Sequence, residues 1–222
     1  MQGSFAFGPE IRDHTVIFRL WAPLVEKASI RINHRGEWQM QPIEDGWHIA
    51  DVPEARPGDL YSFILPDGLE VPDPASRFQP DDVHGPSELI DPTFKWRTQH
   101  WKGRPWEEIV IYELHVGAFT QAGTFLSAIE KLDHLQQLGI TAIQLMPLSD
   151  FPGRYGWGYD GVLPYAPDSS YGRPEDLKTL VDAAHQRGIC VFLDVVYNHF
   201  GPDGNSAPRF SDGYCKIGRA HV

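Results

Sequence analysis

Three apolar runs in the second half of the chain end in side chains that are suited to chemistry. The runs are EIVIYELHV (Glu108–Val116), ITAIQLMPL (Ile140–Leu148) and ICVFLDVVY (Ile189–Tyr197). The first run ends in Tyr112, Glu113 and His115, and the third in Asp194, Asn198 and His199. Side chains of these types form hydrogen bonds and exchange protons, so each group is a candidate binding or catalytic set.

The second run leads into the glycine-rich loop RYGWGYDGVLPYAP, in which Trp157 and Tyr159 are flanked by glycines. Two aromatic rings in such a loop make a mobile stacking surface for a ligand with both C–H faces and hydroxyl groups. They also have a structural interpretation, in which they pack the loop. Asn198 has one too, because Asn often caps a turn. Asp194 favours function more strongly, because burying an Asp inside an apolar run is costly.

Two amphipathic helices and three apolar strands are expected to position these side chains. The first helix runs from an N-cap at Thr124 to a stop at Gly139, and the second begins at Pro174 and stops at Gly188. The apolar face of the first helix comprises Phe125, Ala128, Ile129, Leu132, Leu135 and Leu138. Strands buried on both faces and joined by helices predict a parallel α/β sheet, with its site at the carboxyl ends of the strands.

The first half of the chain has a different pattern. Short β-rich runs separated by Gly and Pro turns predict a β-sandwich; they are His14–Pro23, Lys27–Asn33, Gly46–Val52 and Leu60–Pro66. The proline-rich segment after them, VPDPASRFQPDDVHGPSELIDP, is expected to be an ordered connector along the neighbouring domain. We therefore divide the chain into residues 1–97, a β-sandwich with its connector, and residues 98–222, an α/β unit.

Composition and charge narrow the function classes. The 222 residues contain 19 Lys and Arg against 30 Asp and Glu, a net charge of −11, which disfavours nucleic acid as a partner. No apolar run is long enough to span a membrane, and the first residues do not have the pattern of a secretion signal. The expected location is cytoplasmic. Neither a metal nor a cofactor is predicted, because no His-x-x-x-His, paired-carboxylate or phosphate-binding motif appears.

The motifs YELHVGAFT, QLMPLSDFPG, GWGYDGVLPYAPDSSYG and DVVYNHFGPDGN resemble the α-amylase superfamily of glycoside hydrolases, family 13. This resemblance implies an immunoglobulin-like β-sandwich, followed by the first three βα units of a truncated (β/α)8 barrel. It also implies that Asp194 holds the catalytic corner in place, that His199 hydrogen-bonds the sugar, and that Tyr159 stacks on it. Asn198 corresponds to a calcium-binding position in many amylases, but no metal is predicted. Trp157 and His115 complete the expected substrate-binding set.

The resemblance also implies a reaction. FRLWAP, GLEVPDPASRFQP and DVHGPSELIDP favour members that cleave the α-1,4 bond next to the terminal trehalose of maltooligosyltrehalose, with retention of configuration. In the superfamily the nucleophilic Asp and the acid Glu follow later strands, so we expect both beyond Val222 and no activity from these 222 residues alone. The final residues KIGRAHV do not fit the superfamily pattern, and we predict that they are not native.

Two alternatives remain open. The first is a branching or debranching enzyme of the same superfamily, which would share the sandwich-plus-barrel plan. The second is a non-catalytic α-glucan-binding protein that uses Trp21, Trp38 and Trp47 as a sugar platform. Such tryptophans are more often core or interface residues.

Overall fold

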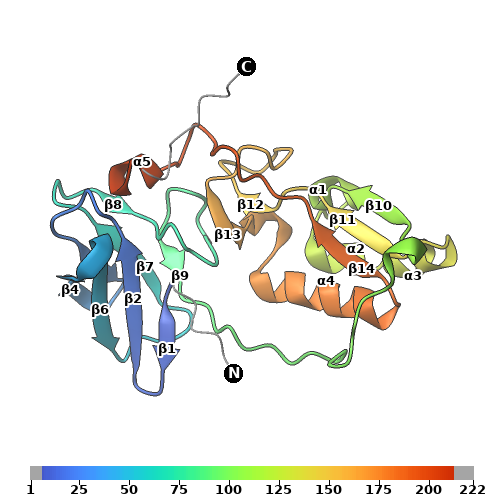
Figure 1. Ribbon diagram of the computed structural model, residues 1–222, viewed down its shortest axis with the longest axis horizontal. Helices are drawn as coiled ribbons and strands as arrows, with labels where there is room; N and C mark the ends of the chain where they lie inside the picture. The colour runs from blue at the N-terminus through green and yellow to red at the C-terminus, as the bar shows by residue number, and fades with distance from the viewer. Residues whose placement is uncertain (1–6, 213–222) are drawn as a thin grey trace.

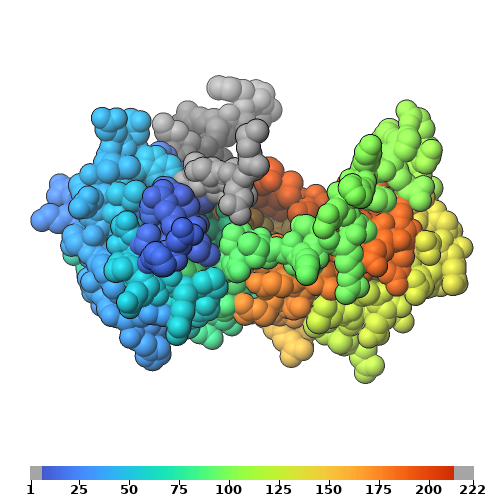
Figure 2. Space-filling model, turned by 90° about the horizontal axis from the view of Figure 1, so that it is seen from below, coloured from blue at the N-terminus to red at the C-terminus, as the bar shows by residue number. Residues whose placement is uncertain are grey.

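The computed structural model describes residues 7–212, so the prediction about KIGRAHV lies outside the described residues. A β-rich half and a half with a small sheet and helices lie side by side, joined by a long extended segment (Figure 1). Figure 2 shows this segment crossing the helical half. There the backbone N–H groups of Arg97 and Thr98 donate to the Asp182 carboxylate, each over 3.1 Å. Within residues 7–212 no helix is long and apolar enough to cross a bilayer.

The first half consists of two antiparallel sheets around one core. The first sheet has the order β1 (Glu10–Arg12), β2 (Thr15–Trp21), β6 (Trp47–Pro53), β5 (Gln41–Pro42). The second has the order β4 (Gly36–Gln39), β3 (Ser29–Ile32), β7 (Leu60–Ile64), β8 (Glu70–Val71), and β9 (Ser87–Glu88) also pairs with β7. The core includes Phe18 from β2 and Phe63 from β7.

The sequence predicted the strands β2, β3, β6 and β7, and the structure confirms them. β1, β4 and β5 were missed because they have almost no buried side chains, and β8 and β9 because each has only two residues. The 3-10 turn η1 (Glu44–Gly46) precedes β6. Apolar alternation therefore identified only the strands that build the core.

The connector after β8 is ordered by buried polar side chains. Tyr61 of β7 donates its hydroxyl to Asp73 over 2.9 Å, and the Asp73 amide donates to the Ser87 hydroxyl over 3.1 Å. Burial raises the pKa of the Asp73 carboxyl to about 6. At its far end the connector meets the other half, where Arg173 forms a salt bridge of 2.6 Å with Glu88. This confirms the prediction of an ordered connector.

The second half is built on a three-stranded parallel sheet, as predicted. Its order is β10 (Ile111–Leu114), β11 (Ala142–Leu145), β14 (Cys190–Leu193). The helices are α1 (Val116–Phe119), α2 (Phe125–Ile129), α3 (Leu132–Gln137), α4 (Pro174–Gln186) and α5 (Ala207–Phe210). The hairpin of β12 (Ser149–Asp150) and β13 (Leu163–Pro167) and the 3-10 turns η2 (Trp106–Glu108) and η3 (Ser169–Tyr171) complete it.

The helix ends follow from local sequence. The Thr124 side chain accepts a hydrogen bond from the Ser127 amide, and Pro174 occupies the first turn of α4. At Gly139 and Gly188, with φ of 88° and 69°, the chain turns off the helix. The following isoleucine amide donates to the carbonyl five residues earlier, at Ile140 and again at Ile189. This is the glycine-dependent helix stop that the sequence predicted.

Two expectations were wrong. The first helix is not continuous: it tightens at Glu130 and Lys131, whose amides bond three rather than four residues back. Leu138, placed on its apolar face, is 63% exposed because the helix ends before it. In addition, the side chains of β10 and β14 are not buried on both faces, and each of these strands pairs only with β11 in the described range. Ile111 is 42% exposed and Leu193 is 53% exposed.

These exposed strand faces predict that residues 1–222 associate when they are expressed alone. Val110, Ile111, Leu193 and Val195 present apolar side chains beside strand edges that are open to pairing. Sedimentation velocity should therefore show oligomers that grow with concentration. A monomer that unfolds in one sharp thermal transition would contradict this prediction.

Candidate functional site

The parallel sheet brings polar side chains to one edge at its carboxyl ends. In the strand register Glu113 of β10 lies beside Gln144 of β11, and the Gln144 amide donates to the Glu113 carboxylate over 2.8 Å. The Asp194 amide donates to the Leu145 carbonyl over 2.9 Å, which extends the pairing one residue beyond β14. Asp194 is therefore fixed to the sheet by its backbone, while its carboxylate is available at the edge.

Tyr159 reaches this edge from the loop between β12 and β13. Its hydroxyl donates to Asp194 Oδ2 over 3.1 Å, across 35 residues of sequence. The bond to Asp194 raises the pKa of the Tyr159 phenol, and the charge of Glu113 adds to the effect. Because a nearby carboxylate disfavours the phenolate, the hydroxyl remains a donor.

His199 is held by both of its ring nitrogens. Nε2 lies 2.9 Å from the Tyr159 carbonyl oxygen, and Nδ1 lies 2.9 Å from the Asn198 side-chain amide. A carbonyl oxygen only accepts, so Nε2 carries the hydrogen and Nδ1 accepts from the Asn198 NH₂ group. The structure thus places four of the six predicted site residues, Tyr159, Asp194, Asn198 and His199, in one hydrogen-bonded group, which we call the corner.

The other two predicted residues, His115 and Trp157, pack against each other. His115 Nε2 donates to the Gly156 carbonyl over 2.8 Å, and its ring lies edge-on to Trp157 with centroids 6.3 Å apart. Tyr171 packs against the same imidazole at 5.8 Å. His115 therefore holds the loop by its backbone and makes no bond to the corner.

Residues 83–209 match the family model described as the α-amylase catalytic domain. This chain belongs to the α-amylase family. The matched residues include the whole parallel sheet, the loop with Tyr159, and the corner.

Within the α-amylase family, the chain is similar to malto-oligosyltrehalose trehalohydrolases. It is 47% identical to the one from Saccharolobus solfataricus over 94% of this chain, and 50% identical to the one from Deinococcus radiodurans over 89%. It spans only 38% and 32% of those proteins. A putative α-amylase structure from Salmonella typhimurium superposes with a TM-score of 0.89 at 50% identity, covering 92% of this chain and 35% of that one. A branching enzyme from Corynebacterium jeikeium is 30% identical over 94% of this chain and 32% of its own length.

The segments of this α-amylase-family chain that carry the corner also carry exposed aromatic rings. Tyr155, Trp157 and Tyr197 are 87%, 73% and 83% exposed, and Tyr159 is 43% exposed. Such rings offer flat apolar faces with polar rims. Sequence reasoning missed Tyr155 and Tyr197. Tyr197 looked like the end of a buried strand, but β14 ends at Leu193.

Glycines allow close packing around the loop between β12 and β13, residues 151–162, which we call the aromatic loop. Gly158 has φ of 86°, and a Cβ atom there would lie 2.1 Å from the Pro147 carbonyl oxygen. A Cβ atom at Gly201 would lie 2.1 Å from the Asp160 carbonyl oxygen. The loop is therefore pressed against β11's end on one side and against the segment after His199 on the other.

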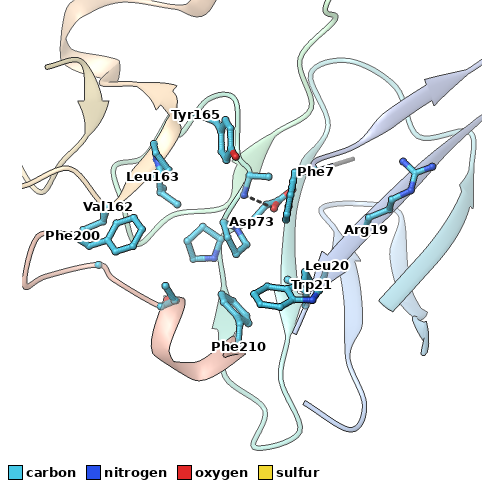
Figure 3. A pocket seen from close by; sticks show the side chains of 17 residues that line it. Phe7, Arg19, Leu20, Trp21, Asp73, Val162, Leu163, Tyr165, Phe200 and Phe210 are labelled. Atoms are coloured by element: carbon cyan, nitrogen blue, oxygen red, sulfur yellow. Dashed lines mark hydrogen bonds between the residues drawn. The ribbon is translucent and has the colours of Figure 1, made fainter. Parts of the chain in front are cut away.

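An apolar cavity of about 200 Å³ lies between the two halves (Figure 3). Trp21 and Phe210 line one side, and Leu163 and Tyr165 of β13 line the other. The Trp21 indole donates to the Asp45 carbonyl over 2.9 Å.

No group of three or more His, Cys, Asp or Glu among residues 7–212 is arranged to hold a metal ion.

Proposed function

We propose that the enzyme to which this chain contributes hydrolyses the α-1,4 bond next to the terminal trehalose of maltooligosyltrehalose and releases trehalose. The observation that supports this proposal most is that the similarity to trehalohydrolases extends over nearly the whole chain. Identity of 47% to a trehalohydrolase runs through the β-rich half, the connector and the corner, against 30% to a branching enzyme over the same share of the chain.

Each corner residue has a proposed role toward the sugar. The Tyr159 ring stacks on a glucose face, while its bond to Asp194 fixes the ring's position. Asp194 keeps the corner in shape, and His199 hydrogen-bonds a sugar hydroxyl with its orientation set by Asn198. Trp157 adds a second stacking face, and His115 positions the loop. No metal or cofactor is part of this proposal.

The bond-breaking carboxylates are proposed to come from elsewhere in the enzyme. Retention of configuration requires a nucleophilic and an acid/base carboxylate about 5 Å apart. The chain spans 38% of the Saccharolobus solfataricus relative, so we assign both groups to the part of the enzyme that matches the remaining length. Residues 1–222 alone are then expected to release no trehalose.

The finer architecture is also a proposal. We assign the parallel sheet to the first three βα units of a (β/α)8 barrel, and residues 1–97 to an immunoglobulin-like sandwich with its connector. Residues 98–222 would then be the first part of the catalytic barrel. The open edges of β10 and β14 among residues 7–212 support this, because closing a barrel would pair both edges.

Product analysis on the full-length enzyme tests the reaction. We expect free trehalose and a shortened maltodextrin from maltooligosyltrehalose, and no change in branching when amylose is the substrate. New α-1,6 branches without free trehalose would overturn the proposal in favour of a branching enzyme. Cleavage of α-1,6 bonds in pullulan would point to a debranching enzyme.

The alternative of a binding protein that uses the β-rich half is not favoured. Trp38 packs against the sandwich core, Trp47 contacts Phe7 at 5.0 Å between ring centroids, and Trp21 lines the cavity between the halves. Trp21 and Trp47 are cross-strand partners on β2 and β6, but Trp38 of β4 lies in the other sheet, so the three rings do not form one platform. Retarded migration of residues 1–97 in amylose gels would restore this alternative.

A further inference from the structure

Three carboxylates lie at the base of the aromatic loop, in positions that the corner does not use. Asp150 ends β12 where the loop begins, Asp168 follows β13 where it ends, and Asp82 approaches from the connector. Asp150 and Asp168 are 1% and 2% exposed. None of the three forms a salt bridge with Lys or Arg in the part of the chain that the structure describes.

Two of these carboxylates are surrounded by N–H donors. Asp168 accepts from the Ser170 amide over 2.9 Å on one oxygen and from the Phe151 amide over 3.3 Å on the other. Asp82 accepts from the Gly153 amide over 2.8 Å and from the Val83 amide over 2.6 Å. These amide donors offset part of the cost of burying Asp168, although burial still raises the pKa of its carboxyl.

Asp150 has the opposite surroundings. Its Oδ2 atom is buried and has no hydrogen-bond partner among the described residues. Burial, then the charges of Asp168 and Asp82, raise the pKa of the Asp150 carboxyl to about 8, opposed only by a bond from the Ser169 amide. The charged groups that act on Asp150 from the neighbouring elements are thus both acids. An ionised Asp150 would be a third, unpartnered charge, which is costly in this environment.

We propose that Asp150 carries a proton which keeps the base of the aromatic loop closed, and that it is thereby a positioning residue for the stacking of sugar on Tyr159. The inference rests on the proposed function for its effect on substrate, but the state of the loop does not depend on it. Asp168 and Asp82, the two acids that act on Asp150, also bind the loop's first amides, at Phe151 and Gly153.

The proton makes loop opening depend on pH in a defined way. In the open loop Asp150 is solvated and titrates near its ordinary pKa of 3.8, whereas in the closed loop it titrates at about 8. Between these values the open form has released a proton that the closed form retains. The opening constant therefore rises about tenfold per pH unit up to about pH 8 and is constant above it.

Hydrogen exchange of residues 151–162 in the full-length enzyme, from about pH 6 to about pH 9.5, measures this opening once chemical exchange rates are divided out. We expect protection in the native enzyme to fall about tenfold per pH unit to about pH 8 and then level off. In Asp150→Asn, a neutral isostere, protection should be independent of pH. Asp160→Asn, at an exposed acid of the same loop, is the matched control and should keep the native slope.

The consequence for substrate is a KM that rises with pH in the native enzyme only where the opening constant approaches one, and that is flat in Asp150→Asn, with kcat less affected. Protection that is flat with pH in the native enzyme would overturn the proposal, and so would a native slope in Asp150→Asn. A loss of protection on adding EDTA at neutral pH would assign the balancing charge to a metal ion instead. If Asp150→Asn does not fold, the pH dependence of protection in the native enzyme alone decides whether the proposal stands. If trehalose release is absent but the slope is present, the proposed function fails and this inference stands.

Discussion

Gly158→Ala should lower kcat/KM for trehalose release by the full-length enzyme about 10²-fold or more. A Cβ atom at this position would lie 2.1 Å from the Pro147 carbonyl oxygen, which is backbone and cannot move aside like a flexible side chain. The loop must shift instead, and the next residue is Tyr159, whose hydroxyl bonds Asp194. A displacement of about 1 Å in a positioned group can cost about 10²-fold in rate. Steady-state kinetics on maltooligosyltrehalose measure the effect.

Gly153→Ala provides the matched control in the same loop. Its φ of 80° is close to the 86° of Gly158, but a Cβ atom there would meet nothing within 4 Å. Both substitutions therefore introduce left-handed strain of about 1–2 kcal/mol, while only Gly158→Ala adds a collision. Equal losses of activity in the two variants would show that strain alone matters, and that the close approach to Pro147 does not position Tyr159.

Asp194→Asn should lower kcat/KM about 10²–10³-fold with little loss of folding stability. The substitution keeps the shape and the backbone bond to Leu145, but removes the charge that accepts the Tyr159 hydroxyl over 3.1 Å. Removing one preorganised electrostatic group from an active site has effects of this order. Kinetics together with thermal unfolding of the variant separate the effect on activity from an effect on the fold.

Tyr159→Phe tests how Asp194 acts. This variant keeps the ring for stacking and loses only the hydroxyl, so it should cost less than Asp194→Asn, about tenfold. If Asp194 works mainly through Tyr159, adding Asp194→Asn to a Tyr159→Phe background should cost less than it does in the native enzyme. Fully additive losses would mean that Asp194 acts on the substrate by another route.

The sequence predicted the helix ends, because these depend on hydrogen bonds and backbone angles of neighbouring residues. The Thr124 cap, Pro174 and the stops at Gly139 and Gly188 each follow from a few neighbouring residues, and all are as expected. The exposure of Leu138 was not foreseen, because the tightening at Glu130 and Lys131 shifts where the helix ends. The β12–β13 hairpin was missed because it pairs only two residues and has no alternating pattern.

The candidate site was predicted as a set of residues but not as a geometry. Parallel strands place their carboxyl ends together, so Asp194, Asn198 and His199 could be grouped with Tyr159 from the sequence. The bonds that join them cannot be read from spacing, since Tyr159 and Asp194 are 35 residues apart. The burial of Asp150 and Asp168 was also not predicted, because both stand in short stretches without a periodic apolar pattern.

The most direct test of the central claim, that the corner binds an α-glucan, is a crystal structure of the full-length enzyme with a bound maltooligosaccharide. We expect a glucose ring stacked on Tyr159, with a hydroxyl within hydrogen-bond distance of His199 and with the Tyr159–Asp194 bond kept. A sugar that binds only on the β-rich half, with nothing between Tyr159 and His199, would contradict the account.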